Sequence, residues 1–347
     1  MGGAAGQHAV PRRDPGRAGT RHRVPRAGDL AAVRAWPAVT SVDQLRGISL
    51  TQLRYFIRVA ERESMTRAAE DLFVAQSAVS SAVAHLEKEL GVQLFIRRHA
   101  KGLILTPAGR ELLLRARQIL TALAESLESI AGDARALWGA LHVVCFSPLA
   151  PFYLPSILTG LKLEHPGLEL LVSEAVAGEV GEYLESGRAE VALTYDLALA
   201  DGIEREVLAE IRPYVALPAG HRLADAPSVH LRDLVEEDMI LVDLPYSRDY
   251  FIGVFTARGL APKIQYRSGS YETVRAMVAQ HHGYSLLHQR PATDTTYGGG
   301  RVVAVPLADD VEPLRVVVAH LGSLRLSRRA RAFTDRCRVV VTDVNPG

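Results

Sequence analysis

The chain has 347 residues, 48% of them hydrophobic, so it is long enough for two or three compact units. Its net charge of +1 excludes a chain that is basic throughout, although one basic module joined to an acidic one remains open. Cys145 and Cys337 match neither a disulfide framework nor a zinc spacing, which fits a reducing compartment. No stretch approaches the roughly 20 apolar residues that a membrane span needs, and no export signal follows Arg12 and Arg13. We therefore expect a cytoplasmic protein without membrane contact.

Residues 1–48 form a leader rich in Gly, Ala, Pro and Arg, without helical or strand periodicity. Because this composition cannot bury enough apolar surface to order the chain, we expect the leader to be disordered. Three interpretations stay open: an arm that touches nucleic acid, a solvated tail, or a start codon assigned too early. The folded protein is expected to begin near Ser49.

Residues 49–107 begin with three short amphipathic helices. Ser64 is the expected N-cap of the second helix, at residues 65–72, and Gly91 is expected to end the third, at residues 76–90. Two short helices, a tight turn and a third helix predict a helix-turn-helix.

The exposed first turn of the third helix carries short polar side chains. Such side chains can donate and accept hydrogen bonds at base edges in the major groove of DNA. The alternative is that Ser77 caps the helix and the others form a solvated face. The candidates for reading a DNA sequence are Gln76, Ser77, Ser80 and Ser81.

Two short extended pieces follow in residues 95–107, around a glycine turn that carries a dense basic cluster. This pattern predicts a wing. Arg97, Arg98 and Lys101 are expected to lie beside phosphates or in an adjacent minor groove, which supplies affinity that falls with salt but little sequence information.

These residues form one long pattern: Leu53-Arg54-Tyr55-Phe56, Val59-Ala60-Glu61, Ser64, Ala68-Ala69, Leu72, Gln76 to Ser80, Leu86-Glu87, Leu90-Gly91, Leu94-Phe95, Arg97 and Leu105-Thr106-Pro107-Ala108-Gly109. In order and spacing it resembles the DNA-binding domain of LysR-type transcriptional regulators, over residues 50 to about 116. Family members often have Pro at the place of Ser77 and a basic residue near Ser81 or His85. Fewer cations on this helix weaken its expected contacts with the DNA backbone.

Residues 108–138 are predicted as a linker helix with an apolar heptad seam. The stripe either packs on its own domain or pairs with a second copy. In the resembled family the equivalent helix dimerises, so we expect a homodimer on double-stranded promoter or operator DNA, and a homotetramer stays open. The seam consists of Leu113, Ala116, Leu120, Leu123, Leu127, Ile130, Ala134 and Leu137.

In residues 139–341 short apolar runs alternate with helical segments, which predicts an α/β domain with a mainly parallel sheet. The resemblance implies an effector domain of the type 2 periplasmic-binding-protein-like class. We expect one lobe at about 142–210 and 315–341, and a second lobe at about 211–314.

The resemblance also implies a small-molecule effector between the lobes, at strand ends where helix N-termini offer free N–H groups. Hydroxyl side chains there suit a small polar or anionic ligand, although each also has an ordinary role as a cap or surface residue. Ser147 is expected to cap a helix as well, and Arg248 either pairs with a ligand carboxylate or forms a surface salt bridge. The effector candidates are Ser147, Tyr195, Tyr246, Ser247, Ser270 and Tyr271.

No P-loop, dinucleotide fingerprint, nucleophile elbow or HExxH motif occurs, so we expect no enzyme, catalytic residue, metal or resident cofactor. His281, His282 and His288 lack a metal-ligand spacing, and Cys145 is expected to be inert packing rather than a redox sensor. A transport protein that binds solutes would explain only the second half. The sequence therefore predicts a DNA-binding transcriptional regulator under allosteric control, with RNA polymerase as a further partner to consider.

Overall fold

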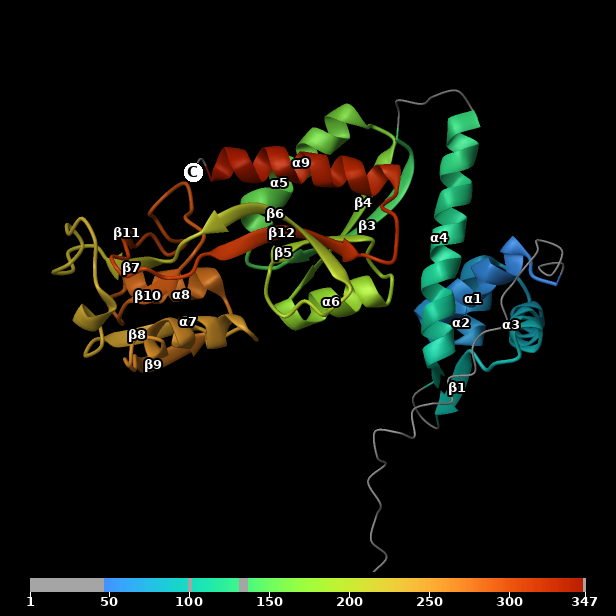
Figure 1. Ribbon diagram of the computed structural model, residues 1–347, viewed down its shortest axis with the longest axis horizontal. Helices are drawn as coiled ribbons and strands as arrows, with labels where there is room; N and C mark the ends of the chain where they lie inside the picture. The colour runs from blue at the N-terminus through green and yellow to red at the C-terminus, as the bar shows by residue number, and fades with distance from the viewer. Residues whose placement is uncertain (1–46, 99–101, 131–136, 346–347) are drawn as a thin grey trace, which may run out of the picture. The chain divides into compact units, whose positions relative to one another are not determined.

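The computed structural model describes residues 47–98, 102–130 and 137–345 (Figure 1). For Arg97, Arg98 and residues 128–130 it describes the backbone alone. Residues 1–46 of the leader and Lys101, on which two of the predictions rest, lie outside the described residues. No helix among the described residues is both long enough and apolar enough to cross a membrane.

The described residues open with three helices, α1 (Leu50–Arg62), α2 (Met65–Leu72) and α3 (Gln76–Leu90). The Ser64 hydroxyl accepts a hydrogen bond from the backbone N–H of Arg67, and Gly91 takes a φ of 67° after α3. Both predicted helix signals are therefore confirmed. A left-handed φ costs glycine little because it has no Cβ.

The three helices enclose a small core that excludes water. Phe56, Val79 and Leu86 are fully buried, and the Phe56 and Phe95 ring centroids lie 5.4 Å apart. Buried Ala68 and Ala69 let α2 pack closely against its neighbours. Phe95 begins β1 (Phe95–Arg98), which pairs antiparallel with β2 (Gly102–Leu105). The predicted helix-turn-helix and wing are thus both present.

Helix α4 (Pro107–Ile130) changes its surroundings along its length. Leu113 and Ala116 are buried in the core of the helix-turn-helix, whereas Leu123 is 38% exposed and Leu127 is 59% exposed. Placing Leu137 on this helix was wrong, because Leu137 lies outside any helix and is buried just before β3. Its helical spacing was accidental. Ala134 lies outside the described residues.

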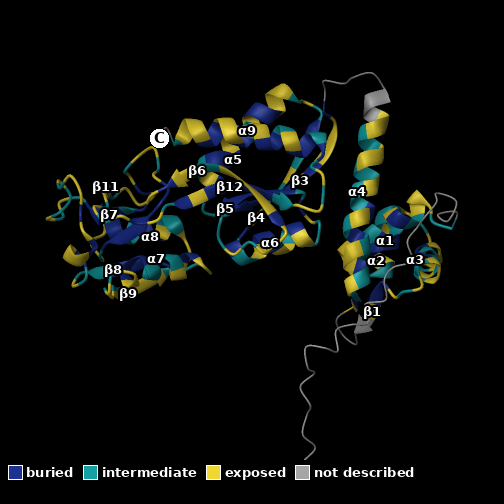
Figure 2. Cartoon of the chain, viewed as in Figure 1, coloured by how far each residue is buried: buried dark blue, intermediate teal, exposed yellow. Residues whose placement is uncertain are grey.

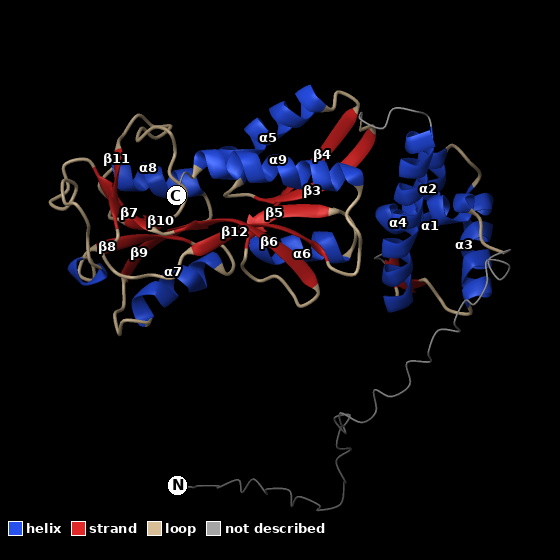
Figure 3. Ribbon diagram, turned by 45° about the horizontal axis from the view of Figure 1, so that its top comes forward, coloured by secondary structure: helices blue, strands red, loops and turns tan. Residues whose placement is uncertain are grey.

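The next part of the chain builds a five-stranded sheet in the order β4-β3-β5-β12-β6. Helices α5 and α9 lie side by side on one face of this sheet and α6 lies on the other (Figures 1 and 3). The elements are β3 (Gly139–Phe146), α5 (Ala150–Glu164), β4 (Leu168–Ala175), α6 (Ala177–Glu185), β5 (Val191–Tyr195), β6 (Ile203–Ile211), β12 (Leu314–Leu321) and α9 (Arg328–Val344). We call this part lobe 1.

A second hydrophobic cluster, which runs from Val215 to Val311, defines what we call lobe 2. Its strands form an antiparallel sheet β10-β7-β11 and a parallel pair β8-β9, and a bridge from Met239 to Tyr284 connects the two. The elements are β7 (Tyr214–Pro218), the short η2 (Leu231–Asp233), β8 (Asp238–Val242), α7 (Ser247–Thr256), β9 (Lys263–Ser268), α8 (Tyr271–Ala279), β10 (Ser285–Leu287) and β11 (Val302–Pro306).

The expectation of a mainly parallel sheet holds for β4, β3, β5 and β6 of lobe 1, which run in one direction, but it is wrong for β12 and for the antiparallel sheet of lobe 2. In lobe 1, β3 pairs parallel with β4 and β5, but β12 pairs antiparallel with β5 and β6. The chain leaves lobe 1 after β6 and returns through β12, so the returning strand arrives from the opposite direction. Buried residues gather on β3, β5 and β12 of lobe 1 and on β7, β8 and β10 of lobe 2, whereas β4, β6 and β9 are mostly exposed or half-buried (Figure 2).

The start of α4 yields a prediction about stability. A Cβ at Gly109 would overlap the carbonyl oxygen of Leu94, whereas one at Gly253, inside α7, would meet open space. We expect Gly109→Ala to destabilise the protein by about 1–3 kcal/mol although alanine favours helices. The control Gly253→Ala is expected to stabilise it by about 0.5–1 kcal/mol. Urea unfolding measures both, and a Gly109→Ala variant at least as stable as the parent would contradict this packing.

Candidate functional site

The predicted DNA-reading residues occupy the outer face of α3. Gln76, Ser77 and Ser81 are exposed and Ser80 is half-buried, while Val79, Val83 and Leu86 face the core. The N-cap is Ala75 and no side chain caps the helix, so Ser77 does not act as a cap. The polar first turn is therefore free to meet a ligand from outside the chain.

The turn before α3 adds a residue that the sequence analysis did not single out. Phe73 has a φ of 54° and is 95% exposed. An exposed aromatic ring next to a recognition helix can contact thymine methyl groups or sugars. Its apolar type had indicated only a short apolar turn, because sequence alone does not show the outward direction. Beyond α3, Arg97 and Arg98 lie on β1, opposite Leu103 and Gly102 of β2.

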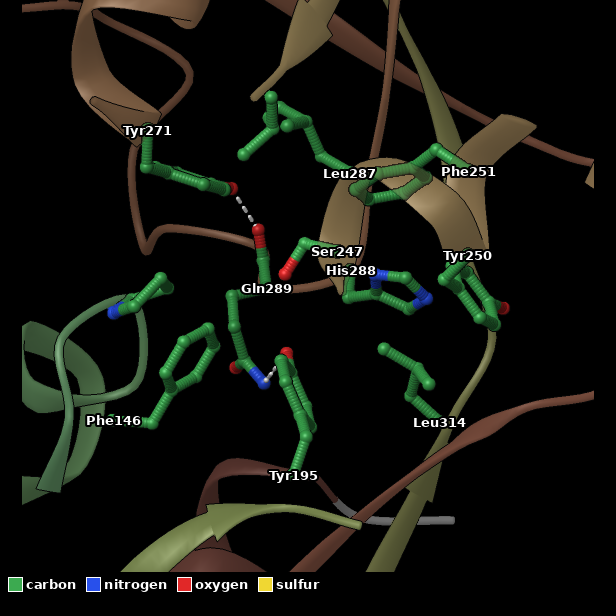
Figure 4. A pocket seen from close by; sticks show the side chains of 12 residues that line it. Phe146, Tyr195, Ser247, Tyr250, Phe251, Tyr271, Leu287, His288, Gln289 and Leu314 are labelled. Atoms are coloured by element: carbon green, nitrogen blue, oxygen red, sulfur yellow. Dashed lines mark hydrogen bonds between the residues drawn. The ribbon is translucent and has the colours of Figure 1, made fainter. Parts of the chain in front are cut away.

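A cavity lies where the two lobes meet (Figure 4), with a volume of about 30 Å³. Rings dominate its wall, and several hydroxyl and amide groups are set among them. Lobe 1 contributes Phe146, Pro148, Tyr195 and Leu314, and lobe 2 contributes Val242, Ser247, Tyr250, Phe251, Tyr271, Leu287, His288 and Gln289.

Three of the six predicted effector residues line this cavity: Tyr195 at the end of β5, Ser247 at the start of α7, and Tyr271 at the start of α8. Strand ends and helix starts bring them together, as the prediction assumed. Ser247 is buried, and the ring of Tyr195 lies 5.7 Å from that of Phe146, measured between centroids.

The structure does not bring Ser147, Tyr246 and Ser270 to the cavity wall. Ser270 caps α8 by accepting a hydrogen bond from Thr273, and Tyr246 is 48% exposed with a φ of 64°. The predicted cap by Ser147 is wrong, because its hydroxyl donates to the carbonyl of Ala175 and α5 begins only at Ala150.

Arg248 has surface partners. Its guanidinium lies 3.5 Å from a carboxylate oxygen of Asp243 and 3.3 Å from one of Asp249. It is not among the residues that line the cavity. Of the two interpretations of Arg248, these ion pairs match the surface salt bridge.

Gln289, which sequence reasoning missed, connects the lobes through its buried side chain. Its Oε1 accepts a hydrogen bond from the Tyr153 hydroxyl at 2.9 Å, and its Nε2 donates to the Tyr195 hydroxyl at 3.0 Å. Its backbone carbonyl accepts from the Tyr214 and Tyr271 hydroxyls of its own lobe. Separating the lobes at this point breaks hydrogen bonds between buried groups.

His288 brings a neutral imidazole into the cavity wall. Its ring centroid lies 5.0 Å from that of Tyr250 and 5.1 Å from that of Phe251. Burial lowers the pKa of His288 to about 3, so the ring is uncharged at physiological pH, and its Nε2 has no hydrogen-bond partner in the described part of the chain. Burial also raises the pKa of Tyr250 to about 12, which keeps that hydroxyl protonated.

The sequence offered one signal for the missed residues. The run Tyr284 to Gln289 follows a glycine, contains the buried strand β10 and ends in two polar residues. Polar residues at the end of a short buried strand are candidates for a site by the same rule that selected Tyr195. The expectation that His288 is structural used metal spacing alone, which does not test for a role in a cavity wall.

The remaining reactive groups are sequestered. Cys145 and Cys337 are both buried, and burial raises the pKa of each thiol, so neither forms the reactive thiolate readily. In the part of the chain that the structure describes, no cluster of three or more His, Cys, Asp or Glu side chains is suited to a metal ion.

Comparison with known proteins matches both halves of the chain to family models. Residues 50–110 match the model for the bacterial regulatory helix-turn-helix protein of the lysR family, and residues 134–341 match the LysR substrate binding domain. The second match alone covers more than half of the chain.

Individual relatives agree with these matches. The chain is 30% identical over 243 residues to YvbU, an uncharacterized HTH-type transcriptional regulator of Bacillus subtilis, covering 70% of this chain and 82% of that one. It is also 30% identical to the transcriptional dual regulator GltC of B. subtilis, over 72% of this chain and 83% of that protein. The crystal structure of HinK, a LysR family transcriptional regulator from Pseudomonas aeruginosa, matches with a TM-score of 0.57 and 39% identity, over 84% of this chain and 98% of that one.

Burial of His288 predicts a pH dependence of stability. Its pKa is about 3 in the folded protein and about 6.5 when unfolded, so the unfolded chain takes up the proton first as pH falls. Stability is therefore lost below about pH 6.5, and the His288 contribution between pH 7 and 5.5 is about 1 kcal/mol. Denaturant unfolding at pH 7 and at pH 5.5 measures this change. Between these two pH values the free energy of unfolding of His288→Phe should fall by about 1 kcal/mol less than that of the parent. The control His282→Phe, at an exposed site, should lose as much stability as the parent. If the free energy of unfolding falls equally in the parent and both variants, His288 is not a neutral buried group.

Proposed function

The chain belongs to the LysR family of DNA-binding transcriptional regulators, and from this premise we propose that it binds its operator as a dimer and senses a small molecule between lobes 1 and 2. The family consists of regulators rather than enzymes. The observation that carries the sensing proposal is a cavity lined from both lobes, on a chain that also presents a DNA-reading helix. We place this activity in the cytoplasm, where the DNA is.

On the DNA side, the exposed first turn of α3 supports sequence readout by Gln76, Ser77, Ser80 and Ser81. The wing, with Arg97, Arg98 and Lys101, is proposed to contact phosphates and to supply most of the salt-dependent affinity.

The effector proposal depends on groups that the lobes share. Tyr195 comes from lobe 1, and Ser247 and Tyr271 come from lobe 2, so one bound molecule touches both lobes. A ligand that fits one angle between the lobes better than another shifts the balance between the two states. A coupling free energy of about 1–3 kcal/mol then changes DNA affinity by about 5- to 150-fold.

The dimer proposal depends on the distal part of α4. Leu123 and Leu127 are exposed in a single chain and continue the heptad spacing of the buried Leu113 and Ala116. Exposed leucines at that spacing are covered when a second copy packs along them. A symmetric pair of chains presents two recognition helices to half-sites one helical turn or more apart.

We expect the double variant Leu123→Glu with Leu127→Glu to dissociate the dimer, because each carboxylate would be buried without a partner. A penalty of a few kcal/mol raises the dissociation constant by roughly 100-fold or more. The control Gln118→Glu adds a charge on the opposite side of the helix and should leave the dimer intact. Sedimentation velocity measures the assembly, and an unchanged dimer in the double variant would rule out this seam.

The proposed function is tested by protection of the upstream intergenic DNA at two salt concentrations, with and without candidate metabolites. We expect Arg97→Ala with Arg98→Ala to weaken binding to every DNA sequence. The slope of the logarithm of the binding constant against the logarithm of the salt concentration should fall in magnitude by about 2.

Gln76→Ala should instead relax discrimination at one base position, by about 1–3 kcal/mol. If none of these changes alters binding, the DNA assignments are wrong. If no metabolite alters the footprint, the sensing proposal falls.

A further inference from the structure

We infer that the effector of this chain is a compact uncharged molecule with a flat apolar body and one group that hydrogen-bonds to Nε2 of His288. The inference rests on the proposed sensing role of the cavity and names the class of ligand that this cavity accepts. It replaces the sequence-based expectation of a polar or anionic ligand.

The charge of the ligand follows from the cavity wall. None of the twelve described residues that line it is an Asp, Glu, Lys or Arg. The nearby cationic side chains already form ion pairs. Arg248 pairs with Asp243 and Asp249. Buried Arg275 pairs with Glu272 at 2.6 Å. A carboxylate in the cavity would lose its hydration without gaining a counter-charge, which is unfavourable in a buried site.

The imidazole of His288 does not supply that counter-charge. It is buried among rings, and burial holds its pKa far below physiological pH, so it stays neutral. The hydroxyls of Tyr195, Tyr250 and Tyr271 remain protonated for the same reason, because burial raises the pKa of each. The cavity as a whole therefore carries no formal charge.

The shape of the ligand follows from the rings. Phe146 and Tyr195 face the cavity from lobe 1, and Tyr250, Phe251 and Tyr271 face it from lobe 2 (Figure 4). Aromatic walls on both sides favour a flat apolar body, because ring faces and edges stack on it with little loss of contact. A cationic ligand could also interact with the ring faces. However, no described residue of the wall is a carboxylate that would balance its charge, so an uncharged ligand is favoured.

The polar group of the ligand follows from an unmet hydrogen bond. Nε2 of His288 is buried and has no hydrogen-bond partner among the described residues. Buried polar atoms in native proteins are almost always paired, so an unpaired one in a cavity wall is a candidate partner for a bound water molecule or a ligand atom. The Ser247 hydroxyl lies on the Cβ side of the His288 ring, whereas Nε2 points toward Tyr250 (Figure 4).

The size of the ligand is limited by the closed lobes. A cavity of about 30 Å³ holds about two water molecules, so a larger ligand enters only as the lobes separate. Separation breaks the hydrogen bonds from Gln289 to Tyr153 and Tyr195. A compact ligand disturbs this bridge least.

The test uses three probes of one shape and different charge: benzyl alcohol, benzoate and benzylamine, titrated calorimetrically into the full chain at pH 7.5. We expect benzyl alcohol to bind at least tenfold more tightly than either charged probe. If benzoate or benzylamine binds as tightly or more tightly, or if none of the three binds, the inference is overturned.

The role of His288 is tested by His288→Phe, which keeps an aromatic ring and removes the nitrogen. Affinity for benzyl alcohol should fall at least fivefold, while affinity for toluene, which lacks the hydroxyl, should stay the same or rise. His282→Phe, at an exposed site, should change neither. An unchanged affinity of His288→Phe for benzyl alcohol would overturn the assignment of Nε2, and binding of toluene shows that the variant is folded.

This inference and the proposed function fail in different ways. If some metabolite alters the DNA footprint but all three probes fail to bind, sensing stands and the ligand class is wrong. If benzyl alcohol binds as expected but no metabolite alters the footprint, the cavity chemistry stands and the sensing role is wrong.

Discussion

The side-chain amide of Gln289 constrains the whole effector-binding half of the chain. It comes from lobe 2, is buried, and accepts from Tyr153 and donates to Tyr195 of lobe 1. The network extends further, because Asn345 after α9 donates to the Tyr153 hydroxyl at 3.0 Å. Buried polar groups must be paired, so the lobes close only where these four side chains meet. That condition sets the width of the cavity, and a ligand that changes it changes the angle between the lobes.

Two surfaces that the proposed function needs, one on α3 and one on α4, are exposed in a single chain. The first turn of α3 presents short polar side chains with no intrachain cap, and the distal part of α4 presents exposed leucines. In the proposed function, DNA covers the first surface and a second copy of the chain covers the second. Between them, α4 is anchored by Leu113 and Ala116 in the core of the helix-turn-helix. The same helix thus belongs to the DNA-binding domain at its start and is available for pairing further along.

Local chemistry made much of this fold predictable. The cap at Ser64 and the glycine stop at Gly91 act over three or four residues, so sequence located the helices of the DNA-binding domain correctly. The cavity depends on contacts of long range, since Gln289 and Tyr153 are 136 residues apart. Strand ends and helix starts pointed to Tyr195, Ser247 and Tyr271. The same rule fits Gln289 after β10, but no local pattern shows which residues of lobe 1 it contacts. The error at Leu137 has the same origin, because helical spacing does not reveal where a helix ends.

The most direct test of this account measures the distance between the lobes with and without the Gln289 bridge. Spin labels at Glu182→Cys on α6 and Asp249→Cys on α7 report it, because both sites are exposed and the native cysteines are buried. Labelled chains are diluted into excess unlabelled chains, so that distances within one chain dominate. With Gln289→Leu we expect a longer and broader distance distribution than in the parent. Identical distributions would show that the bridge does not hold the lobes, and would contradict the central claim.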